Sequence, residues 1–276
     1  MEVADSIWLF KVPMMYNPQH YTFSYLLKDS YTLIDTGIEG IEARNSLNEQ
    51  LRMADLKSSD IKRIIITHVH RDHIGLVNYL KALSGAKVYA HERVKKALEN
   101  MDRRNRIEEV RSELKILGAG IFLSILNQYE NTPRQVSDPL SIDETVVDGD
   151  ILSLENVSLK VIWTPGHSQD HICLFNAERR LLFSGDHILP KISSNVSLHT
   201  YENGDPLMDY LNSLDKVRDL PVELVLPAHE HIFKGLDKRI DELKTHHVVR
   251  SEEIIRALKE GDKTVFEVTS RISWST

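Results

Sequence analysis

The sequence predicts a protein of mixed α and β structure, and three stretches near its beginning show this. Residues 6 to 36 alternate apolar and polar side chains between turn signals at Asn17-Pro18 and Lys28-Asp29-Ser30, which predicts a meander of strands. Residues 39 to 55 carry apolar side chains at the spacing of a helix. The β-branched run Ile64-Ile65-Ile66 follows and is typical of a buried strand.

The same patterns continue along the chain. Asp205-Pro206 places an N-cap before a proline at the first helical position, which marks the start of a helix. Residues 261 to 268 predict a turn, a cap and a second short helix. Further strands are predicted over 86–90, 157–162, 171–175, 181–182 and 222–226, and further helices over 75–83, 91–101, 205–218 and 236–260.

A dense group of polar residues, Thr67-His68-Val69-His70-Arg71-Asp72-His73, directly follows the strand that contains Ile64 to Ile66. It holds three imidazoles and one carboxylate at the end of a rigid element. Neutral imidazole and carboxylate are the ligands that zinc, iron and manganese prefer. The run therefore predicts most of a metal site.

Three later segments follow the same rule, because each places a ligand-type side chain just after a predicted strand. His167 follows the strand that ends near Ile162, Asp186 follows Leu181-Leu182, and His229 follows the strand that ends near Leu226. A chain with thirteen histidines will place some of them close together by chance. Four separate segments that obey one rule nevertheless indicate a metal centre.

The motif HxHxDH, followed by single His, Asp and His residues in that order, resembles the signature of the metallo-β-lactamase superfamily over about residues 1 to 235. The resemblance implies an α+β fold. This is the αββα sandwich, in which two mixed β-sheets pack face to face with helices outside. A helical insertion and a C-terminal helical tail are expected in addition.

The resemblance also implies a binuclear centre with two divalent ions. Zn²⁺ is the expected metal, with iron or manganese as alternatives. Asp35, in the segment Leu33 to Gly37, is expected to orient a ligand and not to bind metal itself. The implied ligands are His68, His70 and His167 for the first ion, Asp72, His73 and His229 for the second, and Asp186 as the bridge between them.

Such a centre predicts hydrolysis. A hydroxide that bridges the ions would attack the carbonyl of a small acyl ester, thioester or lactone, and Asp72 is the predicted catalytic residue that orients it and assists proton movement. The chain has no Gly-x-Ser-x-Gly elbow that would indicate a serine nucleophile. Two alternatives stay open: a single-strand-specific endoribonuclease that uses the same metals, and a metal-binding regulatory protein with little turnover.

Departures from subfamily patterns narrow the resemblance. No cysteine stands at a second-ion position, unlike in zinc β-lactamases with a cysteine ligand, and His70 stands where flavo-diiron relatives carry Glu. Only Gly75 follows the motif, where glyoxalase II-like enzymes usually show two glycines. The chain is most similar to the broad group of glyoxalase II-like and small endoribonuclease-like hydrolases.

The predicted organisation is one metallo-β-lactamase-fold domain over 1–235 and a helical segment over 236–276 that resembles the start of a winged helix. A helical insertion at about 95–140 interrupts the first domain. We weigh two roles for it: helices packed against the body, or a lid over the metals. The tail stops before a recognition helix, so a packing or dimerisation role is expected.

Composition limits the partners and the compartment. The 41 acidic and 34 basic residues give a net charge of −7, which disfavours nucleic acid as a partner. The single Cys173 excludes an intrachain disulfide, and its strand position favours a buried structural role. No membrane span or signal peptide is expected, so we predict a cytoplasmic protein with a small acyl substrate, and a homodimer stays open.

Other polar residues lie outside the motif. His187, Asn195 and His199 are close to Asp186 in sequence and have two interpretations, contact with substrate or anchoring of a loop. The pair His246-His247 lies in a charged helical stretch. We interpret that pair as solvated and not as a metal site.

Overall fold

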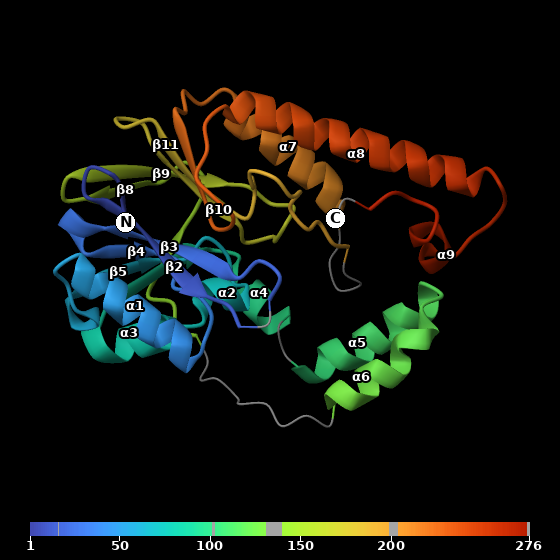
Figure 1. Ribbon diagram of the computed structural model, residues 1–276, viewed down its shortest axis with the longest axis horizontal. Coiled ribbons are helices and arrows are strands. Elements are labelled where there is room, and N and C mark those ends of the chain that lie inside the picture. Colours follow the sequence, from blue (N-terminus) through green and yellow to red (C-terminus); the bar gives the residue numbers. More distant parts are fainter. Residues whose placement is uncertain (16, 101–102, 131–139, 199–203, 275–276) are drawn as a thin grey trace. The chain divides into compact units, whose positions relative to one another are not determined.

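The computed structural model describes residues 1–276 except 16, 101–102, 131–139, 199–203 and 275–276 (Figure 1). The chain divides into two compact units. The domain boundary predicted at residue 235 stays a prediction. The first unit comprises Met1–Ala97, Asp138–Ser197 and Asp205–Ile240, and the second comprises Leu98–Ser137, Leu198–Gly204 and Asp241–Thr276.

A mixed sheet forms one half of the first unit, and in the described residues it has seven strands in the order β1 to β7. Strands β1 to β4 are antiparallel neighbours, whereas β4 to β7 run parallel. The strands are β1 (Glu2–Ala4), β2 (Ile7–Pro13), β3 (Tyr21–Leu27), β4 (Thr32–Ile34), β5 (Arg63–Ile65), β6 (Lys87–His91) and β7 (Glu144–Val146).

A second mixed sheet forms the other half, with five described strands in the order β12-β11-β10-β9-β8. All neighbours are antiparallel except β11 and β12, which are parallel. The strands are β8 (Ile151–Leu154), β9 (Val157–Trp163), β10 (Ile172–Asn176), β11 (Leu181–Gly185) and β12 (Leu224–Pro227).

The apolar core lies between the two sheets. Tyr25 of the first sheet meets Phe183 of the second edge-on, with ring centroids 5.3 Å apart. The Tyr25 hydroxyl donates to the carbonyl of Pro227 at 2.7 Å, and the Phe23 amide donates to the carbonyl of Ala228 at 2.7 Å. The third strand is therefore hydrogen-bonded to the end of the last strand.

Helices cover the sheets on their outer sides. Leu47 and Leu51 are buried from the helix after β4, while Tyr210 and Leu214 are buried from the helix after β11. The carboxylate of Asp205 accepts from the Met208 amide at 3.0 Å, which confirms the predicted N-cap. The helices are α1 (Ile41–Met53), α2 (Arg71–Ile74), α3 (Val77–Ser84), α4 (Val94–Asn100) and α7 (Pro206–Arg218), with 3-10 turns at Lys28–Ser30 and Ser58–Asp60 (Figure 1).

The second unit brings the insertion and the tail together. Phe122 of the insertion meets Phe266 of the tail edge-on at 5.8 Å, and the Phe266 amide donates to the Leu117 carbonyl at 3.0 Å. The lid role of the insertion stays a prediction, and its part over 131–139 lies outside the described residues. The elements are α5 (Arg103–Ile116), a 3-10 turn (Gly120–Phe122), α6 (Leu123–Glu130), α8 (Leu236–Leu258, which begins in the first unit) and α9 (Val265–Thr269).

The elements with strong apolar patterns are confirmed, and several short ones were missed. The predicted strands and helices each correspond to an observed element, with ends that differ by a few residues. The strands β1, β7 and β8 and the short helix α2 were not predicted. In β7 two of three residues are exposed. β8 is mostly apolar in sequence, but it is only four residues long and just one of them, Leu154, is buried.

Gly75 makes a close backbone contact that a side chain would disrupt. Its φ is −57°, an ordinary value, but a Cβ there would lie 2.1 Å from the amide nitrogen of Glu39. We expect Gly75→Ala to lower the free energy of unfolding by about 3 kcal/mol, because the overlap can be relieved only by a backbone shift. Urea unfolding in a chelating buffer measures this, and Gly40→Ala, which meets nothing closer than 3.9 Å, is the matched control. Equal unfolding free energies for the two variants would contradict the expectation.

Cys173 lies buried in β10, as predicted, and burial raises the pKa of its thiol to about 12.

Among the helices formed by described residues, none combines the length and the apolar content needed to cross a bilayer.

Candidate metal centre

The predicted ligands lie where strands of both sheets end. His68, His70, Asp72 and His73 follow β5, His167 follows β9, Asp186 follows β11 and His229 follows β12. The structure brings all seven together in three overlapping groups, and within each group the potential ligand atoms lie within 4.8 Å of one another. One of these groups, His68, His73 and Asp186, connects the other two. Their role as ligands stays a prediction.

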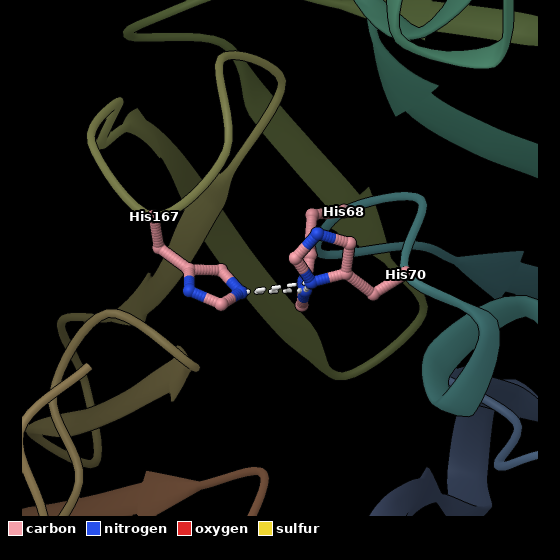
Figure 2. A group of neighbouring side chains, drawn as sticks. All are labelled: His68, His70 and His167. Carbon is pink, nitrogen blue, oxygen red and sulfur yellow. Dashed lines mark hydrogen bonds between the residues drawn. The ribbon is translucent and has the colours of Figure 1, made fainter. Parts of the chain in front are cut away.

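Three histidines form the first group, shown in Figure 2. His68 Nε2 lies 2.9 Å from His70 Nδ1 and 3.2 Å from His167 Nε2, and the last two nitrogens are 2.9 Å apart. Burial lowers the pKa of all three rings, to about 3 for His70 and well below the usual value for His68. All three rings are therefore neutral near pH 7, and each offers a nitrogen to one shared point.

The second group contains Asp72, His73 and His229. Asp72 Oδ2 lies 3.6 Å from His73 Nε2 and 3.4 Å from His229 Nε2. Burial disfavours a charged His229, but the carboxylates of Asp186 and Asp72 outweigh it and raise the pKa of His229 to about 10. This group therefore attracts positive charge.

Asp186 lies between the two groups and presents one oxygen to each. Its Oδ1 lies 3.5 Å from His73 Nε2 and 3.2 Å from His229 Nε2. Its Oδ2 lies 3.5 Å from His167 Nε2 in the first group. Burial alone would raise the pKa of Asp186, but His229 and His73 lower it well below its usual value, so the carboxylate is ionised.

The donor atoms fit a metal. Among the described residues, His73 Nε2, His229 Nε2 and Asp186 Oδ1 are buried without a hydrogen-bond partner, which is rare for buried polar atoms. A Zn–N bond of about 2.0–2.1 Å places two nitrogens of one tetrahedral ion roughly 3.3–3.4 Å apart. The separations in the first group, 2.9 to 3.2 Å, are somewhat shorter than this value, so a small outward shift of the rings would admit an ion. A cation would also give each of the three unpartnered atoms a partner.

Asp35 orients the ring of His73 through a hydrogen bond, as predicted. Its Oδ2 accepts from His73 Nδ1 at 2.7 Å and from the Thr67 hydroxyl at 2.8 Å, while its Oδ1 accepts from the Thr67 amide at 2.8 Å. A carboxylate that accepts at His73 Nδ1 keeps a proton there, so Nε2 is the atom that would bind a metal. Asp35 is buried and has a φ of +57°, a backbone conformation that Asp and Asn tolerate better than most residues.

Two other histidine rings are oriented by hydrogen bonds from Nδ1 to backbone carbonyls. His167 Nδ1 lies 2.8 Å from the carbonyl oxygen of Asn195, and His229 Nδ1 lies 2.9 Å from that of Tyr21. Because a carbonyl can only accept, each ring carries a proton on Nδ1. The Nε2 atom is therefore the one that faces the other donors in both rings: in His167 it is a lone pair, and in His229 a bound metal would displace its proton.

The loop that provides the Asn195 carbonyl is itself anchored. The Glu230 carboxylate accepts from the amides of Lys191 at 2.9 Å and Ile192 at 3.3 Å. The Arg239 guanidinium donates to the carbonyls of Leu189, Lys191 and Ile192 at 2.7 to 2.8 Å. His167 is thus positioned through a loop that two charged side chains fix.

His171 is a structural partner of the centre that was not predicted. Its Nε2 accepts from the Asp186 amide at 3.1 Å, so its Nδ1 donates to the Thr164 hydroxyl at 2.8 Å. Gly185 has a φ of +51°, and a Cβ there would lie only 2.6 Å from this Nε2. The sequence feature that could have revealed His171 is its spacing of four residues from His167, across the turn between β9 and β10.

The other polar residues named from the sequence do not all lie at the candidate metal centre. His187 is fully buried beside Tyr210, at a ring distance of 5.2 Å, and does not line the cavity described below, so contact with substrate is not supported. Asn195 lines that cavity and also anchors His167. His199 lies outside the described residues, and His246 and His247 lie in α8, away from the candidate ligands in sequence.

A cavity of about 400 Å³ opens onto the centre and includes His70, Asp72, His167 and Asp186 in its wall. Part of the wall is apolar, formed by Met14, Ile38, Leu189 and Ile192. The rest is polar, formed by Asn17, Gln19, Arg71, Ser193, Ser194 and Asn195. The volume suits a small organic molecule.

Comparisons with known proteins identify the family of the chain. Residues 18–229 match the family described as the Metallo-beta-lactamase superfamily. The chain is 30% identical to the probable metallo-hydrolase YqjP of Bacillus subtilis (strain 168), over 90% of this chain and 79% of that protein. It is 28% identical to an atrochrysone carboxyl ACP thioesterase of Aspergillus fumigatus, over 48% of this chain and 28% of that protein.

Among solved structures, a metallo-beta-lactamase family protein from Thermus thermophilus superposes with a TM-score of 0.84 at 29% identity. The superposition covers 97% of this chain and 87% of that chain. The predicted αββα sandwich is therefore confirmed, and the His and Asp groups suit divalent metal binding. The chain belongs to the metallo-β-lactamase superfamily and is related to metallo-hydrolases.

Proposed function

We propose that this protein is a binuclear metal-dependent hydrolase of small acyl esters, thioesters or lactones. The single observation that supports it best is the position of Asp186, whose two oxygens lie near two separate groups of donors. His68, His70 and His167 would hold one divalent ion, Asp72, His73 and His229 would hold the other, and Asp186 would contact both. Zn²⁺ suits this donor set, and iron and manganese are the alternatives.

Bound ions would supply a hydroxide nucleophile near neutral pH and a Lewis acid for the substrate carbonyl. The side chains of this protein perform the other tasks. Asp72 lines the cavity and accepts from the Thr22 hydroxyl at 3.3 Å. Burial opposes its ionisation, but His73 and His229 lower the pKa of Asp72 well below its usual value, so the carboxylate is ionised and can accept a hydrogen bond that orients the attacking water.

The cavity wall supports an acyl substrate over RNA. Among the described residues that line it, Arg71 is the only arginine or lysine, so this wall is no basic groove for a phosphodiester backbone. A thioester is included because a fungal relative is named as an acyl-carrier thioesterase. The expected partner is a small molecule; the cytoplasmic location and the homodimer stay predictions.

Elemental analysis together with a panel of esters, thioesters and lactones tests the proposal. We expect about two metal ions per chain and turnover of at least one substrate class. His68→Ala should lose an ion and reduce kcat/KM by roughly a hundredfold or more, because it removes a donor from the first group. His246→Ala, in the tail, is the matched control and should change neither value. Metal and activity that both persist in His68→Ala would refute the proposal, and metal without turnover would favour the regulatory alternative.

A further inference from the structure

Arg71 occupies a position in the cavity wall that the proposed chemistry does not use. It lies between His70 and Asp72, in the wall onto which the candidate metal groups open. Its backbone is fixed, because the amides of His73 and Ile74 both donate to the His70 carbonyl, at 3.0 and 3.2 Å. The backbone of Arg71 is therefore held beside the candidate metal centre by a short helical turn.

The charge of Arg71 is available for a ligand. The residue is exposed, and its side chain makes no hydrogen bond, ion pair or ring contact with any described residue. Its neighbour Asp72 instead takes a hydrogen bond from Thr22 and lies near His73 and His229. An arginine offers five donors in a planar fork, so this one brings unused donors to the cavity.

Two side-chain amides in the same cavity wall add hydrogen-bond donors to those of Arg71. Asn17 uses its side-chain oxygen to accept from the Gln19 amide at 2.9 Å, and Asn195 uses its own to accept from the Ser197 hydroxyl at 3.3 Å. These bonds leave the NH2 groups of Asn17 and Asn195 as donors in the cavity wall. The wall therefore combines one cation and two amide donors with an apolar surface.

We propose that Arg71 forms an anion-recognition site, so that the preferred substrate is an acyl compound with a carboxylate or phosphate beside its apolar part. A guanidinium binds either anion through two parallel hydrogen bonds, and Met14, Ile38, Leu189 and Ile192 would accommodate the carbon chain. The inference rests on the proposed hydrolase function. The anion has two sources, a second carboxylate on the acyl group or a phosphate on the thiol that leaves.

Two matched pairs of thioesters separate these sources. Succinyl and butyryl thioesters of N-acetylcysteamine differ by a carboxylate on the acyl group, and butyryl thioesters of 4′-phosphopantetheine and pantetheine differ by a phosphate on the thiol. We expect the wild-type protein to prefer the anionic member of one pair in kcat/KM. Arg71→Gln should reduce that preference about tenfold or more, and Arg71→Lys should reduce it less, because lysine keeps the charge but not the fork.

Binding provides a measurement that does not depend on turnover. Thioether analogues, in which a methylene replaces the thioester carbonyl, are titrated by calorimetry into the protein with and without its metals. The anionic analogue should bind about tenfold less tightly to Arg71→Gln than to the wild type. Arg52→Gln, on α1 and absent from the cavity wall, is the matched control and should bind like the wild type.

The outcomes separate the two proposals. An unchanged preference and unchanged binding in Arg71→Gln would overturn the anion site while hydrolysis still stood. Turnover of none of the substrates by the wild type would overturn the hydrolase and leave the calorimetric comparison to decide the anion site. Thermal unfolding of Arg71→Gln checks that it folds, and if it does not, Arg71→Lys decides by the same two measurements.

Discussion

Replacing Asp186 by Asn should abolish most of the activity and reduce the metal content from about two ions per chain to about one. The carboxylate presents one oxygen near His167 and the other near His73 and His229. An amide has only one oxygen, so one of the two groups loses its shared ligand. Loss of one ion removes several kcal/mol of transition-state stabilisation, which corresponds to roughly a thousandfold or more in kcat.

Mass spectrometry under native conditions and steady-state kinetics measure the two effects. Asp143→Asn is the matched control, since Asp143 is paired with Lys81 at 2.6 Å and is not among the candidate ligand groups. Its metal content and kcat should equal those of the wild type. Two ions and full activity in Asp186→Asn would show that Asp186 does not bridge.

Asp35→Asn should weaken metal affinity about 10- to 100-fold without touching any proposed ligand. Asn keeps the size and tolerates the positive φ of residue 35. Its oxygen can still accept from the Thr67 amide, but its NH2 group then stands where Oδ2 accepted from His73 Nδ1. That NH2 group needs an acceptor, so the His73 proton moves to Nε2, the atom that should bind metal.

Competition with a coloured chelator measures the affinity, and ¹⁵N NMR of labelled histidines identifies the protonated nitrogen of His73. Asp170→Asn provides a comparison, because Asp170 is also a buried carboxylate that accepts from a backbone amide, that of Val69 at 3.1 Å, while the partner of His73 Nδ1 is Asp35. A change of affinity in Asp35→Asn with the His73 proton still on Nδ1 would contradict the tautomer explanation. An unchanged affinity would show that Asp35 has no positioning role.

Residue types at strand ends made the candidate centre predictable. His68, His70, His167 and Asp186 each follow an apolar run that is visible in the sequence, and the motif order pointed to the fold. The strands around them were predictable for the same reason, because a buried strand needs consecutive apolar residues.

The supporting contacts were not predictable, because they depend on backbone atoms. Any residue could supply the carbonyls that Tyr21 and Asn195 offer to His229 and His167, so the side chains carry no signal. The anchoring of the loop by Arg239 and Glu230 joins segments about 40 to 50 residues apart and depends on the tertiary fold. The strands β1, β7 and β8 have only three or four residues each, which is too short for a pattern to stand out.

The hydrogen bonds between the third strand and the end of the last strand also bear on how the centre assembles. Phe23 and Tyr25 bond to Ala228 and Pro227 across roughly 200 residues, and His229 comes next in the chain. Contacts of such long sequence separation form late, because the loop that they close costs entropy before it is repaid. During folding, the second group of donors, Asp72, His73 and His229, is therefore complete only after β12 packs against β3. The rate of metal uptake would then measure the rate at which the two sheets come together.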